Sequence, residues 1–499
     1  APAPGIGADL SGGSASSTLA LLAAGLPGVP GTLLGHGGTG AGERLLAVTF
    51  NDLTAGTRDP GRTAELERAR ALAEDPRLHH VVVAAAEEAL PYADLDIPLT
   101  DEPGPSLVTA ARHRRRLAAG SADHLTGHGA RQVLDAHPAR LADLLMDRRR
   151  RHLLRPVTAL AKASGPSAGS LLVPLTVYRA ARRLARTPYR AGLEAAAGRL
   201  LEANRPTAAD TAANGMNGTN GANGAHGGTD GADTAQRAAG RGAWGAGRGG
   251  TWGGAPGGPG GPVDASLAAL AWSRPGPAAR WLTGEALAEV SIRLHQAATR
   301  PTSVQRPGEA RARAALARHA ADLRVLEQAA EIRSQRLHAP FLDNQVVRAC
   351  RDLPEALRVR PGARAEILRA VLAGTGIHDL PPGWGATSHA PSAAAAAART
   401  GLRAALPHLL ALFDAPLLAD AGLIEARVVR KALRAAADGE PAGLDGLDGI
   451  ADLVSTELWL RRLLARRGTC WTGAAAPRQR AVAGGIPLRP ALGHATTHG

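Results

Sequence analysis

The sequence predicts an α/β protein in which a parallel sheet with helices is followed by a mainly helical half. Three observations lead to this prediction: apolar runs alternate with helical segments in the first part, a Gly- and Asn-rich stretch follows, and amphipathic helical patterns dominate the rest. Alternating strands and helices are typical of βαβ units, which form parallel sheets. We therefore expect an α/β part over residues 1–203, a disordered linker over 204–262, a helical part over 263–474 and a flexible basic tail over 475–499.

The strands of the α/β part are predicted from short apolar runs. Runs of five to seven residues are typical of strands, whereas the longer segments between them have helical spacing. After residue 263, apolar residues recur at positions i, i+3, i+4 and i+7, which is the pattern of amphipathic helices. We expect strands at residues 6–10, 45–50, 78–84 and 122–126, and helices at residues 16–24, 64–73 and 106–119.

Composition excludes several classes of protein. The 499 residues have a net charge of +14, but aromatic residues make up only 3%, and the basic clusters at residues 113–116 and 148–151 contain none for base stacking. We favour solvated helix faces for these clusters over binding of an anionic partner such as a nucleic acid. The only cysteines, Cys350 and Cys470, exclude a disulfide scaffold and a Cys-rich metal module and suit the cytoplasm. No apolar run is long enough to span a bilayer, so we expect no membrane partner.

The strongest local signal is an apolar run that leads into Ser-Gly-Gly and directly into a helix. Glycines let the backbone approach an anion, hydroxyl groups can donate hydrogen bonds, and a helix N-terminus supplies unpaired N–H groups. The stretch is neither a Walker A loop nor a dinucleotide-binding G-x-G-x-x-G motif. It predicts a phosphate site, and the alternative is an ordinary turn into a helix. The expected phosphate ligands are Ser11, Gly12, Gly13, Ser14, Ser16 and Ser17.

This opening resembles the pyrophosphate loop of N-type ATP pyrophosphatases, whose usual form is S-G-G-x-D-S. Residues 124–129 (HLTGHG) are similar to the G-x-G-x-D motif of asparagine synthetase C-terminal domains, and residues 340–343 (PFLD) to their P-F-L-D element. The spacing from residues 127–129 to residues 141–145 (LADLL), together with the C-terminal pattern at residues 401–406, 417–423 and 457–464, is similar to the branch of lasso-peptide macrolactam cyclases. Further matching segments are Glu331-Ile332-Arg333, Leu353-Pro354, Glu366-Ile367-Leu368-Arg369 and Leu380-Pro381.

The resemblance implies a Rossmann-like sheet of the adenine nucleotide alpha hydrolase-like type and an ATP-dependent amide ligase that uses Mg²⁺. In such enzymes a carboxylate attacks the α-phosphate of ATP, pyrophosphate leaves, and an amine then displaces AMP. The residues given include no glutaminase domain, so we expect the amine to be supplied by another molecule or by the substrate itself. The expected substrate is a small-molecule or peptide carboxylate. The expected protein partners are a precursor peptide, a leader-binding protein or a separate protease.

The resemblance also implies roles for individual residues. For catalysis we expect His128, Glu331 and His389. For binding of ATP and pyrophosphate we expect, besides the Ser-Gly-Gly loop, Thr49, Gly127 and Gly129. For the substrate pocket we expect Asp101, Glu102 and Asp343, although Asp101 and Glu102 fit a helix-capping loop equally well.

Three positions differ from the family pattern. Ala15 stands where S-G-G-x-D-S has its aspartate, and Arg131 stands where G-x-G-x-D has its acid. The segment after the last Leu-Pro has no lysine, because the chain's only lysines, Lys162 and Lys431, lie elsewhere. Alanine and arginine cannot replace a carboxylate as a ligand of Mg²⁺, so we expect no metal site formed by these residues.

The sequence therefore leaves three hypotheses open. The first is an ATP-dependent ligase that forms an amide bond, as in asparagine synthesis or peptide macrolactam formation. The second is a catalytically impaired relative that binds a nucleotide or a peptide as the partner of an active enzyme. The third is a tRNA-modifying ATP pyrophosphatase, which the basic charge favours and the P-F-L-D segment in a helical half opposes.

Overall fold

The computed structural model describes residues 3–26, 44–52, 60–149, 152–162, 172–203, 270–300, 306–331, 335–386, 391–438 and 444–470. The expected linker at residues 204–262 and the expected tail at residues 475–499 lie outside these described residues. His389 lies outside them as well.

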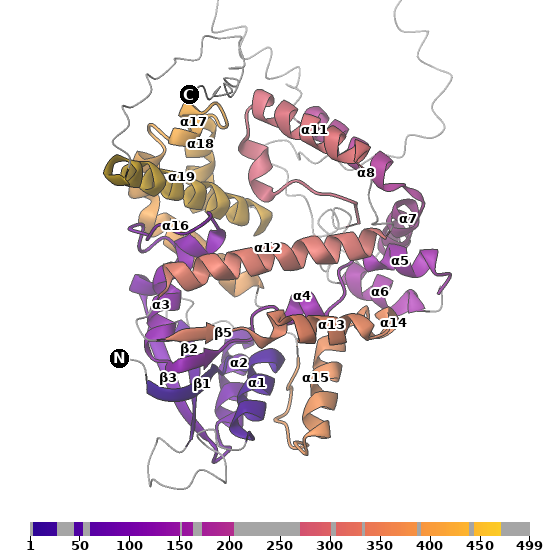
Figure 1. Ribbon diagram of the computed structural model, residues 1–499, viewed down its shortest axis with the longest axis vertical. Helices are drawn as coiled ribbons and strands as arrows, with labels where there is room; N and C mark the ends of the chain where they lie inside the picture. The colour runs from indigo at the N-terminus through magenta and orange to yellow at the C-terminus, as the bar shows by residue number, and fades with distance from the viewer. Residues whose placement is uncertain are drawn as a thin grey trace, which may run out of the picture.

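A parallel β-sheet forms the framework of the α/β part (Figure 1). In the described part of the chain it has five strands in the order β3-β2-β1-β4-β5, and each pair of neighbours is parallel. Ala8 on the central strand lies opposite Ala47 on one side and Leu125 on the other. The predicted Rossmann-like parallel sheet is thus confirmed. The strands are β1 (Ala3–Asp9), β2 (Leu45–Asp52), β3 (Leu78–Ala85), β4 (Ser121–Leu125) and β5 (Arg336–His338).

The fifth strand comes from the part of the chain for which the sequence predicts helices. Leu337 of β5 lies opposite His124 of β4, and the Thr126 N–H donates to the His338 carbonyl oxygen at 2.8 Å. A segment of three residues is too short to show a strand period. Pairing with β4, rather than a local pattern, therefore makes it a strand.

Helices cover both faces of the sheet. The connections from β1 to β2 and from β2 to β3 advance in one direction, whereas the next connection returns across β1 to β4. Because such crossovers are right-handed, their helices lie on opposite faces. On one face, α1 and α2 pack with α13 and α15 in one apolar cluster, and on the other, Leu117 of α3 packs with Leu323 and Leu326 of α12. These helices are α1 (Ser14–Ala24), α2 (Pro60–Leu72), α3 (Ala110–Ala118), α12 (Pro307–Ala329), α13 (Asn344–Asp352) and α15 (Ala363–Gly374).

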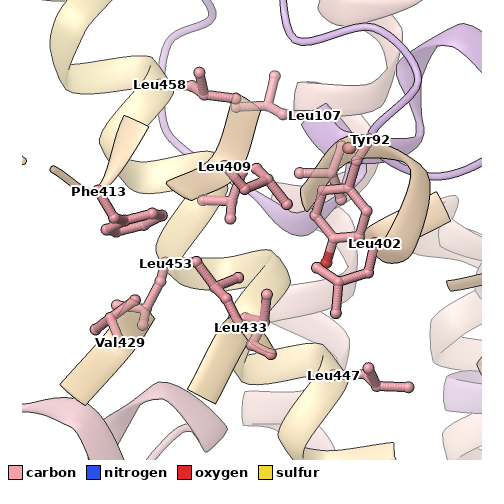
Figure 2. Packing of buried hydrophobic residues seen from close by; sticks show 14 of the residues in the cluster. Tyr92, Leu107, Leu402, Leu409, Phe413, Val429, Leu433, Leu447, Leu453 and Leu458 are labelled. Atoms are coloured by element: carbon pink, nitrogen blue, oxygen red, sulfur yellow. The ribbon is translucent and has the colours of Figure 1, made fainter. Parts of the chain in front are cut away.

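A second apolar core lies among the C-terminal helices α16 (Pro391–Leu412), α18 (Ala426–Asp438) and α19 (Leu444–Cys470). Phe413 is fully buried in this core (Figure 2). Tyr92 and Leu107, which precede α3 in the chain, also belong to this core. The connection between β3 and α3 is therefore built into the C-terminal bundle.

Helix α12 joins the parts of the molecule and crosses it between the sheet and the C-terminal helices (Figure 1). At its start, the buried Asp143 accepts hydrogen bonds from Gly308 N at 2.9 Å and Glu309 N at 3.1 Å. A carboxylate at this position satisfies helix N–H groups that would otherwise be unpaired. Further along, Asp322 accepts from both Ser106 N and Ser106 Oγ. These bonds anchor α12 at residues 308–309 and at residue 322. They therefore fix the position of His319, which lies between these anchored residues and belongs to the site described below.

The other helices complete the body of the protein. Those around α12 bury a third cluster that includes Leu141, Val177 and Trp272. None of the described helices is long and apolar enough to cross a membrane. The remaining α-helices are α4 (Ala130–Leu134), α5 (Arg140–Met146), α6 (Leu154–Lys162), α7 (Leu172–Arg186), α8 (Tyr189–Ala203), α11 (Gly284–Thr299), α14 (Glu355–Arg358) and α17 (Leu417–Asp420).

Candidate functional site

The order of the strands identifies the edge of the sheet where a ligand would bind. The chain reverses its direction across the sheet at β1 and β4, and in open α/β sheets ligands bind outside the carboxyl ends of the strands at such a reversal. The loops at this place are residues 10–13 after β1 and residues 126–129 after β4. A Cβ atom on Gly127 would lie 3.1 Å from Ser16 N and 3.3 Å from the Ala15 Cβ, so the two loops are neighbours.

The first loop, residues 11–13, is called here the Ser-Gly-Gly loop. Gly12 has a φ of +74°, and a Cβ atom there would overlap the Glu65 carbonyl oxygen of α2, so only glycine fits. Ser17 Oγ donates to the Gly13 carbonyl oxygen at 2.6 Å. The Oγ atoms of Ser11 and Ser16 are 2.8 Å apart. The predicted serine hydroxyls therefore hold the loop in shape, and Ser14 begins α1 directly behind it.

Thr49 also acts on this loop through its hydroxyl group. Thr49 Oγ1 donates to the Leu10 carbonyl oxygen, and it lies 2.7 Å from His80 Nε2. Because the single hydroxyl proton is used on Leu10, His80 Nε2 must be the donor of the second bond. Burial, together with the charge of Arg70, lowers the pKa of His80 and favours its neutral form. Thr49 thus fixes the start of the Ser-Gly-Gly loop.

The second loop contains His128 between Gly127 and Gly129. Gly129 N donates to His319 Nε2 at 3.0 Å, and the rings of His128 and His319 are stacked with their centroids 5.7 Å apart. The His113 ring is 6.5 Å from that of His128. Burial and the charge of Arg116 lower the pKa of His128 to about 4, so its imidazole is neutral at pH 7. Burial lowers the pKa of His319 too.

Behind both loops lies a buried charged network that the sequence interpretation missed. Asp9, the last residue of β1, lies 3.2 Å from Arg116 Nη1 through Oδ2 and 3.2 Å from His124 Nε2 through Oδ1. Burial alone would raise the pKa of Asp9. The Arg116 charge and the hydrogen bonds from His124 and Thr126 outweigh this effect and hold the pKa well below its usual range. Asp9 is therefore ionised at neutral pH.

One interpretation of the sequence is wrong for Arg116. The basic cluster at residues 113–116 was expected to be a solvated helix face, but the Arg116 side chain is only 16% exposed because it pairs with Asp9. The prediction does hold for Arg115, whose side chain is 49% exposed. A signal for the pair was present in the sequence, since Asp9 is a carboxylate at the end of an otherwise apolar strand and requires a buried partner.

The remaining predicted residues lie in separate places. Glu331 is exposed just beyond the end of α12. About 15 Å of helix separates the end of α12 from His319, so Glu331 does not lie at the two loops. Asp101 and Glu102 line a cavity of about 210 Å³ with Arg324 and Gln328 of α12.

Asp343 lies apart from that cavity. Its Oδ1 accepts from Gln345 N at 2.7 Å and caps α13. Asp is among the residues preferred at this position, so the cap itself was predictable from the sequence.

Many doubly wound α/β proteins hold the phosphates of nucleotides on a glycine-containing loop at a helix N-terminus where the strand order reverses, which is where the Ser-Gly-Gly loop lies. The chain belongs to the asparagine synthase family: it matches the family described as Asparagine synthase over residues 4–461. No match was found among curated proteins or among solved structures. Members of this family are ATP-dependent ligases that form carbon–nitrogen bonds of the amide type, and they generally use ATP and Mg²⁺.

The residues at the site do not fit a bound Mg²⁺ ion. Ala15 offers only a methyl group beside Gly127, and Arg131, exposed on the first turn of α4, has no anionic oxygen. Both oxygens of Asp9 already face protein donors. Across the described residues, no group of three or more His, Cys, Asp or Glu side chains could hold a metal ion. Mg²⁺ prefers several oxygen ligands, with carboxylates among them.

The two lysines of the chain belong to α6 and α18. Lys431 is exposed on α18, and Figure 1 shows this helix near the end of the molecule opposite α1. Lys162 is the last residue of α6. An arginine does reach the Ser-Gly-Gly loop, because Arg68 Nε donates to the Gly12 carbonyl oxygen at 3.1 Å.

Proposed function

We propose that the chain is an ATP-dependent ligase that activates the carboxylate of a peptide or another metabolite as an acyl-adenylate and transfers the acyl group to an amine. The observation that supports this proposal is the contact between the Ser-Gly-Gly loop and Gly127. A Cβ atom on Gly127 would lie 3.1 Å from Ser16 N, so a side chain at this position would crowd the first-turn N–H group that we assign to phosphate binding.

Each residue would contribute one part of this chemistry. The first-turn N–H groups of α1 would hold the phosphates while a substrate carboxylate oxygen forms a bond to the α-phosphorus and pyrophosphate leaves. The amine nitrogen would then attack the acyl carbon, and AMP would leave with the oxygen of the former carboxylate. His128, neutral because of its lowered pKa, has one N–H group that would donate to a phosphate or carbonyl oxygen.

The test is the formation of AMP by the full chain. We would incubate it with α-labelled ATP, with and without Mg²⁺, and with a linear peptide that has a free N-terminal amine and an internal Asp or Glu. We expect labelled AMP together with a peptide that has lost one molecule of water.

The matched variants for this test are Gly127→Ala and Gly198→Ala. The first places a methyl group 3.1 Å from Ser16 N, whereas the second adds one in open space on α8. We expect only Gly127→Ala to lose ATP binding and AMP formation, by tenfold or more. Equal activity in the two variants would show that nucleotide binds somewhere else.

A second candidate function is supported by the replaced acids. With Ala15 and Arg131 at the metal positions, the chain would bind a nucleotide or a peptide without turnover and act as the partner of an active enzyme. Calorimetry that detects ATP binding, combined with no AMP formation from a panel of peptides, would favour this candidate over the ligase. A precursor peptide, a leader-binding protein and a protease are the partners we propose for either function.

A further inference from the structure

We propose that the Nε and Nη2 donors of Arg116, and not a divalent cation, bind the phosphates at the Ser-Gly-Gly loop. The inference rests on the proposed function, because it concerns how the same site binds its nucleotide. It goes beyond that function by naming a guanidinium group as the replacement for the metal ion.

The first argument is the state of the Arg116 guanidinium group. Its Nη1 faces Asp9 Oδ2 at 3.2 Å, two residues before the Ser-Gly-Gly loop begins. Its Nε and Nη2 atoms are buried and have no hydrogen-bond partner in the described part of the chain. Buried donors without an acceptor are unfavourable, so they mark a place where an acceptor is expected.

The second argument is the geometry of these two donors. The Nε–H and Nη2–H groups share one edge of the planar guanidinium group. Through such an edge an arginine donates two parallel hydrogen bonds to phosphate or carboxylate oxygens. Asp9 uses the opposite nitrogen, and Asp9 itself is held by His124 Nε2. The Asp9 carboxylate therefore orients the guanidinium group through Nη1, and the Nε–Nη2 edge has no hydrogen-bond partner in the described part of the chain.

The third argument is the balance of charge at the site. In the family pattern, one Mg²⁺ ion and two aspartates sum to zero. In this chain, Ala15 and Arg131 at the same two positions sum to +1 without any metal, and the Asp9–Arg116 pair adds zero. Arg68 brings one more positive charge to the loop by donating to the Gly12 carbonyl oxygen at 3.1 Å. By these formal charges Arg131 and Arg68 make the site positive without a metal ion, and an added Mg²⁺ ion would lack the carboxylates that normally balance it.

The experiment measures binding by calorimetry with three probes, each in EDTA and in Mg²⁺. The probes are ATP, inorganic pyrophosphate and acetate. We expect ATP and pyrophosphate to bind in EDTA with affinities within threefold of those in Mg²⁺, and acetate to bind far more weakly. Stronger binding of acetate than of pyrophosphate would show that the Arg116 edge holds a carboxylate, and it would overturn the proposal.

Three variants test the role of Arg116. The Asp9→Asn/Arg116→Gln double variant removes both charges and leaves neither partner buried alone, and we expect it to fold and to bind pyrophosphate in EDTA at least tenfold more weakly. Arg116→Lys keeps the charge but loses the two-donor edge, and we expect a smaller loss. The control is Arg115→Gln, an exposed neighbour on the same helix, for which we expect unchanged binding.

The outcomes separate this inference from the proposed function. ATP binding that requires Mg²⁺, or a double variant that binds pyrophosphate as the parent does, would overturn the inference and leave the proposed function standing. Pyrophosphate binding in EDTA without ATP binding would support the Arg116 site and contradict the ligase. No binding of either probe in any condition would overturn both.

Discussion

Two regions of this protein are buried to a similar degree and are stabilised in different ways. The C-terminal core around Phe413 is made of apolar side chains, whereas the network behind the two loops contains Asp9, Arg116 and His124 in ionised or hydrogen-bonded form. An apolar core gains stability in proportion to the area that it buries. A buried charge is stable only while its partner is present. We therefore expect substitutions in the apolar core to reduce stability in proportion to the area that they remove. In the charged network we expect a large loss whenever one member of an ion pair is removed without the other.

The largest expected effect in the apolar region is that of Phe413→Ala. Phe413 is fully buried, so its truncation removes buried area and leaves a cavity. We expect a loss of about 3–5 kcal/mol in the free energy of unfolding, measured by urea denaturation. The control is Val428→Ala on α18, a side chain that is 44% exposed, for which we expect a change below about 0.5 kcal/mol. Equal effects of the two substitutions would mean that Phe413 is not part of a packed core.

In the charged network, a double-mutant cycle should give a different pattern. Arg116→Gln alone leaves Asp9 buried without its cation, and we expect a loss of about 3–5 kcal/mol. Adding Asp9→Asn should restore most of that loss, because the unpaired charge is then removed as well. Additive effects of the two substitutions, measured by denaturation at one pH, would contradict a coupled pair.

Gly12→Ala should have an intermediate effect. Gly12 and Gly376 have similar φ values of +74° and +84°, but only at Gly12 would a Cβ atom overlap the neighbouring backbone, whereas at Gly376 it would meet nothing within 4 Å. We expect about 1 kcal/mol for Gly376→Ala from backbone strain, and about 2–3 kcal/mol for Gly12→Ala. The difference between the two melting curves measures the contact between the loop and α2.

A separate effect is expected in the dependence of stability on pH. The folded state lowers the pKa of His128 from its usual 6.5 to about 4, so unfolding takes up a proton between these two pH values. The stabilisation from the neutral imidazole is present above pH 6.5 and is lost as the pH falls towards 4. His128→Gln should therefore flatten the slope in this range by at most about 1.4 kcal/mol per pH unit.

A second histidine provides the control for this prediction. Burial and the charge of Arg311 lower the pKa of His137 to about 4 as well, but His137 lies outside the loops and accepts from Ala139 N. His137→Gln should flatten the slope in a similar way without changing ATP binding. If His128→Gln leaves the slope unchanged, the imidazole is not held neutral by its surroundings.

Much of the α/β framework could be predicted from local patterns. The apolar runs at residues 45–50 and 78–84 became β2 and β3, and the Ser-Gly-Gly loop lies where its glycines and the following helix indicated. β5 could not be predicted, because its three residues become a strand only by pairing with a strand more than 200 residues earlier in the chain. Such pairing leaves no periodic signal in the sequence.

The candidate site was predictable only in part, for a similar reason. Loop glycines are recognisable because the required backbone conformation selects them, and His128 could be found from the motif around it. The position of His319 could not be found, because it comes from the face of a helix that is fixed by Asp143 and by Ser106 far away in the chain. The prediction that Arg116 is exposed to solvent was wrong, because a run of arginines in the sequence does not show which of their side chains is buried.

The placement of β5 and Tyr92 has a consequence for how the chain is synthesised. When residue 203 leaves the ribosome, β4 has no outer neighbour, and Tyr92 and Leu107 lack the C-terminal helices that later bury them. Contacts between segments this far apart slow folding and leave apolar surface exposed in the meantime. The N-terminal part is therefore a poor candidate for folding by itself during translation, and the nascent chain reaches its final state only after the last helix has emerged.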